Sequence, residues 1–163
     1  MTLLKFITAT VLLIASATLA AAQGTQVAFG TIQQNSGLPV EVTAENLSVD
    51  QAEGRAVFSE NVLIIQGEMR LSADQVTVVY DTVAQGIDQI EAVGNVILIS
   101  GEDAAESDRA EYNVDDGTIV MTGNVLVAQG PSALTADRMT VRVQDGTAQM
   151  SGRVRTVLQP GDN

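Results

Sequence analysis

The residues of this sequence best suited to chemistry are carboxylates. Three aspartates, Asp74, Asp108 and Asp137, recur in similar surroundings. Paired carboxylates can act as a general acid and a general base. No second carboxylate or nucleophile accompanies these three, and the chain has no His and no Cys, hence no imidazole base, thiolate nucleophile or usual zinc site. We interpret the aspartates as structural and expect no enzyme.

Acidic residues are densest between Asp81 and Asp116, where Arg109 is the only basic residue. Carboxylates in loops can bind calcium, so a calcium site is one interpretation of this region. The ligand spacing of a calcium-binding loop is absent, which favours a solvated loop surface. We therefore expect neither a metal nor a cofactor.

Composition excludes two further classes of protein. The 163 residues carry 20 acids against 8 bases, a net charge of −12, and 3% are aromatic. Nucleic-acid binding needs a basic surface and stacking platforms, so we expect no nucleic-acid partner. A hydrophobic content of 45% also excludes a disordered acidic tail. The length suits one domain with its own core.

Residues 1–22 have the pattern of a secretory signal peptide. Lys5 precedes an apolar stretch over 6–19, and Ala20 to Ala22 resemble a small-residue cleavage site. The alternative is an uncleaved anchor, although the apolar stretch is shorter than the roughly 20 residues that a spanning helix needs. We expect cleavage after Ala22, a periplasmic location, a flexible segment over 23–39, one domain over 40–158 and a C-terminal tail over 159–163.

The remaining sequence contains a repeated unit. The run Asn61-Val-Leu-Ile-Ile-Gln-Gly67 recurs in similar form at 95–101 and at 124–130. An aspartate follows the first residue of each run by 13 positions. Apolar and polar residues alternate along these segments, which end in turn pairs such as Asp116-Gly117. Each unit is predicted to be a strand, a tight turn and a returning strand.

The side-chain alternation predicts a bend in every unit. In the first strand of each unit the apolar face slips by one residue at Glu45, Asp74, Asp108 and Asp137. Because strand periodicity is two, such a slip indicates a bulge or a sharp bend. Bends at the same level would fold one long sheet into two facing sheets. The predicted fold is all-β: an antiparallel two-sheet roll of about four bent hairpin units, open at both ends.

The returning strands keep a single phase and carry glycine on the inward face. Gly94, Gly123 and Gly152 occupy equivalent places, where a missing side chain permits bending or close approach. Glu60 holds this place in the first unit, and the sequence offers no explanation for it.

The repeated Ala73-Asp74 and Gly123-Asn124-Val125 segments, with their spacing over residues 40–157, resemble the OstA/LptA-type family of periplasmic lipopolysaccharide-transport proteins. The resemblance implies a β-jellyroll that passes lipopolysaccharide from the inner to the outer membrane. It also implies head-to-tail filaments of this chain between LptC-like inner-membrane and LptD-like outer-membrane partners. Two alternatives stay open, an anchored LptC-like subunit and a secreted structural or adhesive β-repeat protein without a lipid ligand.

Inward-facing apolar residues are the candidates for holding the acyl chains of lipid A. A closed core is the alternative for any one of them, because such stripes are commonly core. The candidate lipid-binding residues are Val76, Val78, Tyr80, Ile90, Val96, Leu98, Tyr112, Ile119, Met121, Val125, Val127, Met139 and Val141.

The first and last strands, near 40–49 and 148–158, are predicted to leave unpaired edges. The first region carries acids without a base, whereas the last carries Arg153 and Arg155. Opposite charge favours head-to-tail association of two copies, although the alternative is ordinary surface charge screened by salt. The candidate edge residues are Val40, Val42, Glu45, Leu47, Met150, Arg153 and Arg155.

Overall fold

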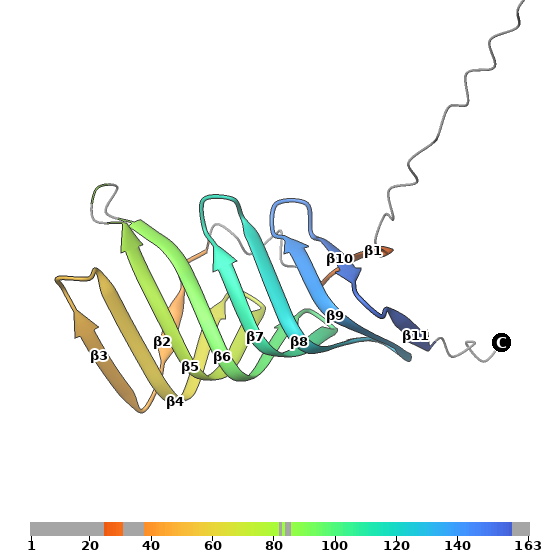
Figure 1. The fold of residues 1–163 in the computed structure, drawn as a ribbon, viewed down its shortest axis with the longest axis horizontal. Coiled ribbons are helices and arrows are strands. Elements are labelled where there is room, and N and C mark those ends of the chain that lie inside the picture. The colour runs from red at the N-terminus through yellow and green to blue at the C-terminus, as the bar shows by residue number, and fades with distance from the viewer. Residues whose placement is uncertain (1–24, 31–37, 82, 84–85, 158–163) are drawn as a thin grey trace, which may run out of the picture.

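The structure, a computed structural model, describes residues 25–30, 38–81, 83 and 86–157 and consists of antiparallel strands (Figure 1). The predicted signal peptide and the 159–163 tail lie outside the described residues. Within these ranges no helix is long and apolar enough to span a membrane. The strands are β1 (Thr25–Ala28), β2 (Glu41–Thr43), β3 (Asn46–Asp50), β4 (Arg55–Gln66), β5 (Met69–Asp81), β6 (Gly86–Ser100), β7 (Asp103–Asn113), β8 (Thr118–Gln129), β9 (Ser132–Arg142), β10 (Thr147–Ser151) and β11 (Arg155–Val157).

All of these strands belong to one 11-stranded sheet that does not close on itself. From β4 to β10 each strand pairs with the next one in sequence, whereas β11 pairs with β9 and β1 pairs with β10 at the far end of the chain. The predicted all-β, open antiparallel fold is confirmed. The two facing sheets expected from the sequence are the two halves of this single sheet.

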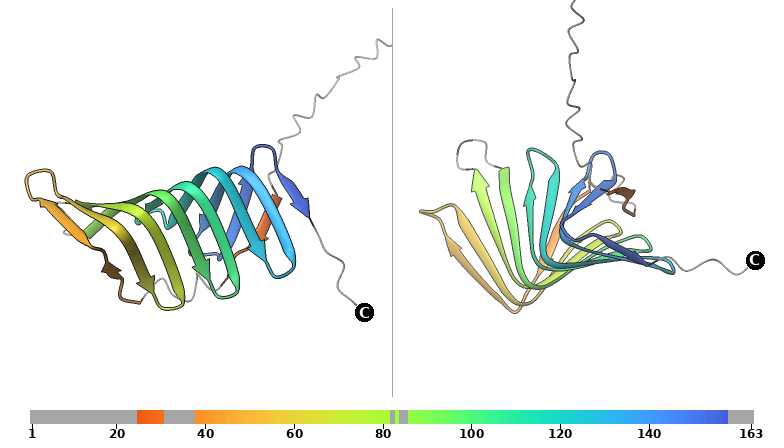
Figure 2. Two further views of the ribbon diagram at one scale, coloured as in Figure 1. Left: turned by 90° about the horizontal axis from the view of Figure 1, so that it is seen from below. Right: turned by 45° about the vertical axis from the view of Figure 1, so that its right-hand side comes forward.

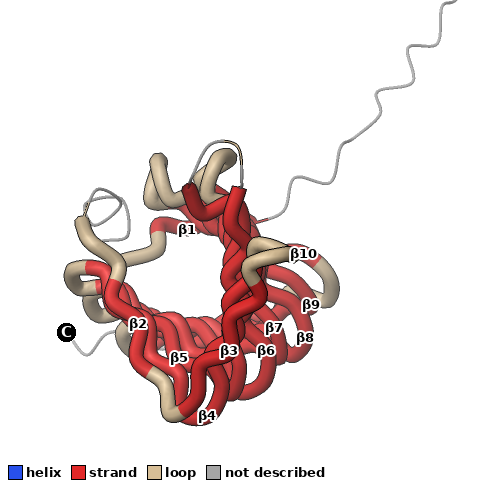
Figure 3. The backbone as a smooth tube through the Cα atoms, turned by 90° about the vertical axis from the view of Figure 1, so that its left-hand side faces the viewer, coloured by secondary structure: helices blue, strands red, loops and turns tan. Residues whose placement is uncertain are grey.

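Each long strand bends near its middle, so the sheet folds into two arms that face each other (Figure 2). The first arm contains β3, β10 and β1, together with one half of each long strand. The second arm contains β2, β11 and the other halves. Seen from the end formed by β2 and β3, the repeated strands stack behind one another around a common interior (Figure 3).

The bend arises where the register between neighbouring strands shifts. Ser72 pairs with Ile97 and Gln75 with Val93, so β6 has one residue more than β5 between these pairs. The extra length lies in Gly94 and Asn95, whose φ angles are 80° and 46°. A bulge or a sharp bend was expected at the acid; the bend is at that level, and the additional residue is in the returning strand, which keeps the apolar faces of both strands inward.

A ladder of side-chain hydrogen bonds fixes the bends. The Nδ2 of Asn95 donates to Asp74 at 2.9 Å, and that of Asn124 donates to Asp108 at the same distance. A side chain at Gly123 would collide with the Asp108 carboxylate, and its φ of 80° is in the left-handed region that favours glycine. The aspartates are therefore structural, as the sequence analysis expects.

The two outer rungs of this ladder differ from the central ones. In the first, Asn61 donates to Glu45 at 2.5 Å, and Glu60 replaces glycine with a φ of 65°. In the last, Arg153 replaces asparagine and contacts Asp137 at 2.6 Å. Glu60 is thus a non-glycine residue in left-handed backbone, which is strained. Glu45 carries its carboxylate one methylene farther from the backbone than an aspartate would.

Candidate functional site

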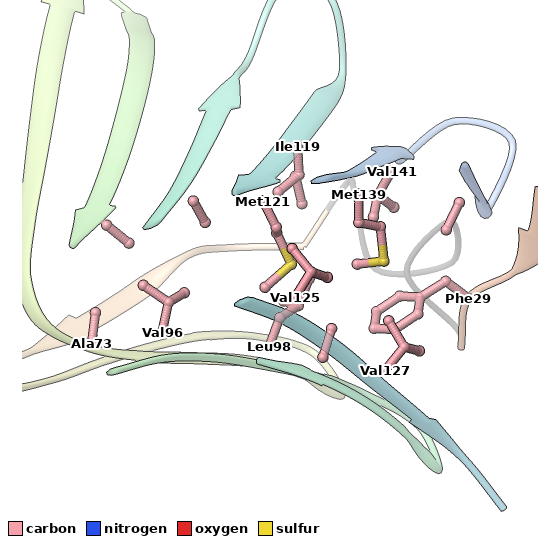
Figure 4. Close-up of a cluster of buried hydrophobic side chains, with 14 of the residues drawn as sticks. Phe29, Ala73, Val96, Leu98, Ile119, Met121, Val125, Val127, Met139 and Val141 are labelled. Atoms are coloured by element: carbon pink, nitrogen blue, oxygen red, sulfur yellow. The ribbon is translucent and has the colours of Figure 1, made fainter. Parts of the chain in front are cut away.

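The predicted inward residues form the interior between the two arms. All of them except Tyr80 and Tyr112 are buried, and Met121, Val125 and Met139 point into the interior with Phe29 beside them (Figure 4). Tyr80 is 44% exposed. Tyr80 lies at the tip of the first arm, where β6 contains an extra residue opposite Val79 and Tyr80, so it is not part of the buried interior and its part in lipid binding stays a prediction.

Tyr112 is half-buried and packs against the core. Burial raises the pKa of its hydroxyl above the ordinary value, so the group is neutral at physiological pH. Its ring lies on the wall of an apolar cavity between the arms. The phenol therefore contributes surface for contact and no charge.

This cavity has a free volume of about 40 Å³. Such a space holds only a few water-sized groups. The side-chain amide of Gln66 donates to the carbonyl of Leu38 at 2.8 Å, and the other lining residues are apolar or, in Tyr112, aromatic. Hydrocarbon suits this lining. The lining residues are Val40, Ile64, Gln66, Met69, Leu71, Ile90, Ala92, Leu98, Ala110, Tyr112 and Ile119.

At the end of the stack formed by β2 and β3, the apolar interior is open to solvent. Leu47 and Val49 pair with Phe58 and Ala56 and share their inward side, yet each is 59% exposed because no described strand pairs with the other side of β3. Val40 of the second arm is also exposed and lines the cavity. The cavity thus adjoins exposed apolar side chains at this open end.

The predicted edge residues Val40, Val42 and Leu47 lie at this open end. β2 and β3 pair only with β4 among the described strands. The structure therefore leaves these residues where the sequence analysis places them, and their part in assembly stays a prediction.

The opposite end is covered by the chain itself. Residues 23–39 were expected to be flexible, but Thr25–Ala28 form β1, which pairs with β10 from Thr25↔Met150 to Ala28↔Thr147. Met150 is fully buried and β1 pairs with its strand, so this edge is covered rather than open, and the part of Met150 in assembly stays a prediction. Backbone pairing and burial of apolar side chains order this short segment.

Phe29 is the interior residue that the sequence analysis missed. Its side chain is fully buried and lies beside Val127 and Met139 (Figure 4). The only available signal was the brief alternation in Gln26-Val27-Ala28-Phe29, far in sequence from the repeats. We call Thr25–Gly30 the N-terminal cap.

Hydrogen bonds tie the cap to both arms. Phe29 donates its backbone N–H to Gly146 at the tip of the first arm, at 3.0 Å. Gly30 donates to Asp103 at the tip of the second arm, at 2.8 Å, and the Gln129 amide donates to Ala28 at 2.7 Å. The cap therefore bridges the two arms at this end.

The charged residues assigned to the edges have partners within the chain. Glu45 accepts from Asn61, and Arg153 pairs with Asp137 while remaining exposed. The hydrogen bond from Arg153 lowers the pKa of Asp137, and the same bond raises the pKa of Arg153. Arg153 is thus not a free charge, and any charge complementarity between the ends depends on Arg155.

No group of three or more His, Cys, Asp or Glu side chains suited to a metal ion occurs among the described residues. Within the 102–116 stretch, Asp103 accepts from Gly30 of the cap, Asp108 accepts from Asn124 and Glu111 pairs with Arg109. What this interior can do chemically is exclude water from hydrocarbon.

Comparison with known families identifies the fold and its context. The model of the family "LptA/(LptD N-terminal domain) LPS transport protein" matches residues 41–147, more than half of the chain. An uncharacterized protein of Rhizobium meliloti (strain 1021) is 34% identical over 116 residues, which are 67% of this chain and 61% of that protein. The chain thus spans less than two thirds of that relative's length.

A solved structure shares the architecture. LptH, described as the LptA homologous periplasmic component of the lipopolysaccharide transport device of Pseudomonas aeruginosa, superposes with a TM-score of 0.69 over 77% of this chain and 99% of that chain. The two sequences are 19% identical, so this likeness establishes the fold. The β-jellyroll expected from the resemblance is confirmed.

Proposed function

Because this chain belongs to the LptA/(LptD N-terminal domain) family of LPS transport proteins, we propose that it is a periplasmic bridge that passes lipopolysaccharide from the inner to the outer membrane. The family is one of transport proteins, and the chain is not an enzyme. The bridge role, head-to-tail assembly and contacts with LptC-like and LptD-like proteins are parts of this proposal.

One observation carries the proposal: an apolar interior with exposed apolar side chains at one end and an apolar cavity within it. Leu47 and Val49 are exposed although they face inward, and Val40, which is also exposed, lines the cavity. Each buried methylene of an acyl chain contributes about 0.8 kcal/mol. Contact with a few methylenes at this end therefore provides affinity without a polar site.

The small cavity implies that the arms separate when a chain enters. About 40 Å³ accommodates the tip of an acyl chain rather than its length. The arms are joined by the bend and, at the far end, by the N-terminal cap, so separation is easiest near β2 and β3. The anionic head group of the lipid stays outside, because a chain of charge −12 repels it.

Lipid extraction tests the proposal directly. Protein purified from a lipopolysaccharide-producing host should carry a lipid-A species detectable by mass spectrometry. The double variant Leu47→Glu/Val49→Glu places charges on the inward side of the open end and should reduce bound lipid about tenfold or more, a loss of at least ~1.4 kcal/mol.

Ser48→Glu is the matched control, because Ser48 lies between these residues on the same exposed strand. It adds a charge to the outer side and should leave lipid binding unchanged. Charged substitutions of Leu98 or Val125 are unsuitable, since both are fully buried and would unfold the chain. Repeated absence of lipid from the wild-type protein would favour the structural β-repeat alternative.

A further inference from the structure

The N-terminal cap occupies the place of a strand from the next repeat. In the first arm, one inward row of paired residues runs from Val49 of β3 through successive strands to Ala148 of β10. Val27 of β1 pairs with Ala148 and ends this row. The earliest strand of the chain therefore completes a sheet that otherwise follows the sequence order.

β1 and β3 match each other position by position. The adjacent inward row begins at Leu47 and ends with Met150, which pairs with Thr25. Val49 follows Leu47 by two residues, as Val27 follows Thr25, so the two strands have the same direction and the same inward phase. β3 of a second copy would therefore fit the edge of β10 in the register that β1 now holds.

We infer that the N-terminal cap and β3 of a second copy compete for the β10 edge, so that head-to-tail assembly proceeds by strand exchange. This inference rests on the proposed bridge function, which requires copies to join end to end. In the free chain Leu47 and Val49 are each 59% exposed. Exchange would bury both against the β10 edge that β1 now holds, and this gain opposes the cost of releasing the cap.

The exchange also determines whether the interior ends or continues. With the cap in place, Phe29 fills the interior beside Met139 and the cap bridges the two arm tips through Gly30 and Asp103 (Figure 4). When β3 of a second copy takes the β10 edge, Phe29 leaves with β1. The apolar interior of one copy then meets the open end of the next, whereas a free terminal copy remains closed.

The second arm can make the same kind of contact with a second copy. β11 pairs with β9 and has no strand on its other side among the described residues. The row that contains Thr43 in β2 ends with Arg155 in β11. β2 of the incoming copy would therefore extend the second arm while β3 replaces the cap in the first.

A reversible lock on the cap tests the exchange. Gln26 and Gln149 are directly paired and exposed, and the chain has no cysteine of its own. Paired residues of antiparallel strands have Cα atoms about 4.5–5.5 Å apart, within the range of a disulfide. In the variant Gln26→Cys/Gln149→Cys, oxidation should fix β1 to β10, and reduction should release it.

Sedimentation velocity over a concentration series provides the readout. The oxidised variant should remain monomeric at concentrations where the reduced variant and the wild type assemble. The control Val120→Cys/Thr140→Cys places a disulfide between paired residues of β8 and β9, two strands that the exchange does not separate. Its assembly should be the same in the oxidised and reduced states.

Two sedimentation results would contradict the proposed strand exchange. Equal assembly of the oxidised and reduced cap variants would overturn it, and so would a wild type that stays monomeric at every concentration. Phe29→Ala, which weakens the cap without a disulfide, should shift assembly to lower concentration. Lipid-A extraction from the same samples is separate: its failure would remove the transport proposal, whereas the sedimentation result would still decide the strand exchange.

Discussion

The two ends of this sheet handle the same physical problem differently. A stack of hairpins leaves unpaired backbone groups and half-covered apolar rows at each end. At the end formed by β2 and β3, Leu47 and Val49 stay exposed. At the other end, the N-terminal cap pairs with β10 and Phe29 fills the interior. The difference shows that one interior can serve as a closed core at one end and as an accessible apolar surface at the other.

The strongest test of this comparison places the same charge at both ends. Met139→Asp should destabilise the protein by about 3–5 kcal/mol, the cost of an uncompensated buried charge, because Met139 is fully buried. Leu47→Asp should change the free energy of unfolding by no more than about 0.5 kcal/mol, as for an ordinary surface residue. Urea denaturation measures both, and similar losses would contradict the comparison.

A smaller effect comes from adding volume beside the cap and beside the cavity. Ala148→Val, next to the cap, should destabilise by about 1–3 kcal/mol through overpacking, since Ala148 is fully buried. Ala92→Val adds the same two carbons beside the cavity. It should cost less than about 1.5 kcal/mol while lowering bound lipid. Thermal unfolding measures the loss of stability and lipid extraction measures the bound lipid. A larger loss of stability for Ala92→Val than for Ala148→Val would show that the interior is packed more tightly beside the cavity than beside the cap.

The ladder of hydrogen bonds at the bends provides two variants whose stability should change in opposite directions. Glu60→Gly should stabilise the protein by about 1 kcal/mol by removing a non-glycine residue from left-handed backbone. Gly123→Ala introduces both that strain and a collision with Asp108, so it should destabilise the chain. Chemical denaturation of the two variants should give changes of opposite sign. A loss of stability in Glu60→Gly would mean that the Glu60 side chain stabilises the first rung.

The smallest effect is expected at the last rung. Arg153→Asn makes this rung like the central ones and should slightly lower stability at neutral pH, because the ion pair is exposed. The pKa of Asp137 is lowered in the folded chain, so the stabilisation is present above the unfolded pKa of about 3.9. It should disappear as the pH falls through the lowered pKa. Urea midpoints measured from neutral to acidic pH should converge for the two proteins; a constant difference would exclude Asp137 as the cause.

Much of the fold could be predicted from the sequence because it repeats. Alternation identified the inward rows, and the slip of that alternation at Asp74 and its equivalents located the bends at the correct level. The identity of the bulged residues could not be derived in this way, since the extra residue lies in the partner strand, at Gly94 and Asn95. Single-strand periodicity reports which face is buried and does not report how many residues the partner places opposite.

The candidate site was predicted less completely than the fold. The interior rows were identified, but Tyr80 is exposed at the tip of the first arm, and Met150 is covered by β1 rather than open. Phe29 lies outside the repeats and was not selected. Each of these differences occurs at a tip or an end, where the local pattern of one strand no longer determines its neighbours.

The sequence by itself determined the repeated strands, their inward faces and the level of the bends, because backbone geometry and side-chain alternation are local properties. Only the tertiary structure decided which end of the stack is closed. The pairing of β1 with β10 joins Thr25 to Met150. Contacts between such distant segments leave no periodic signal in the chain, and they depend on the free edge that the completed sheet presents.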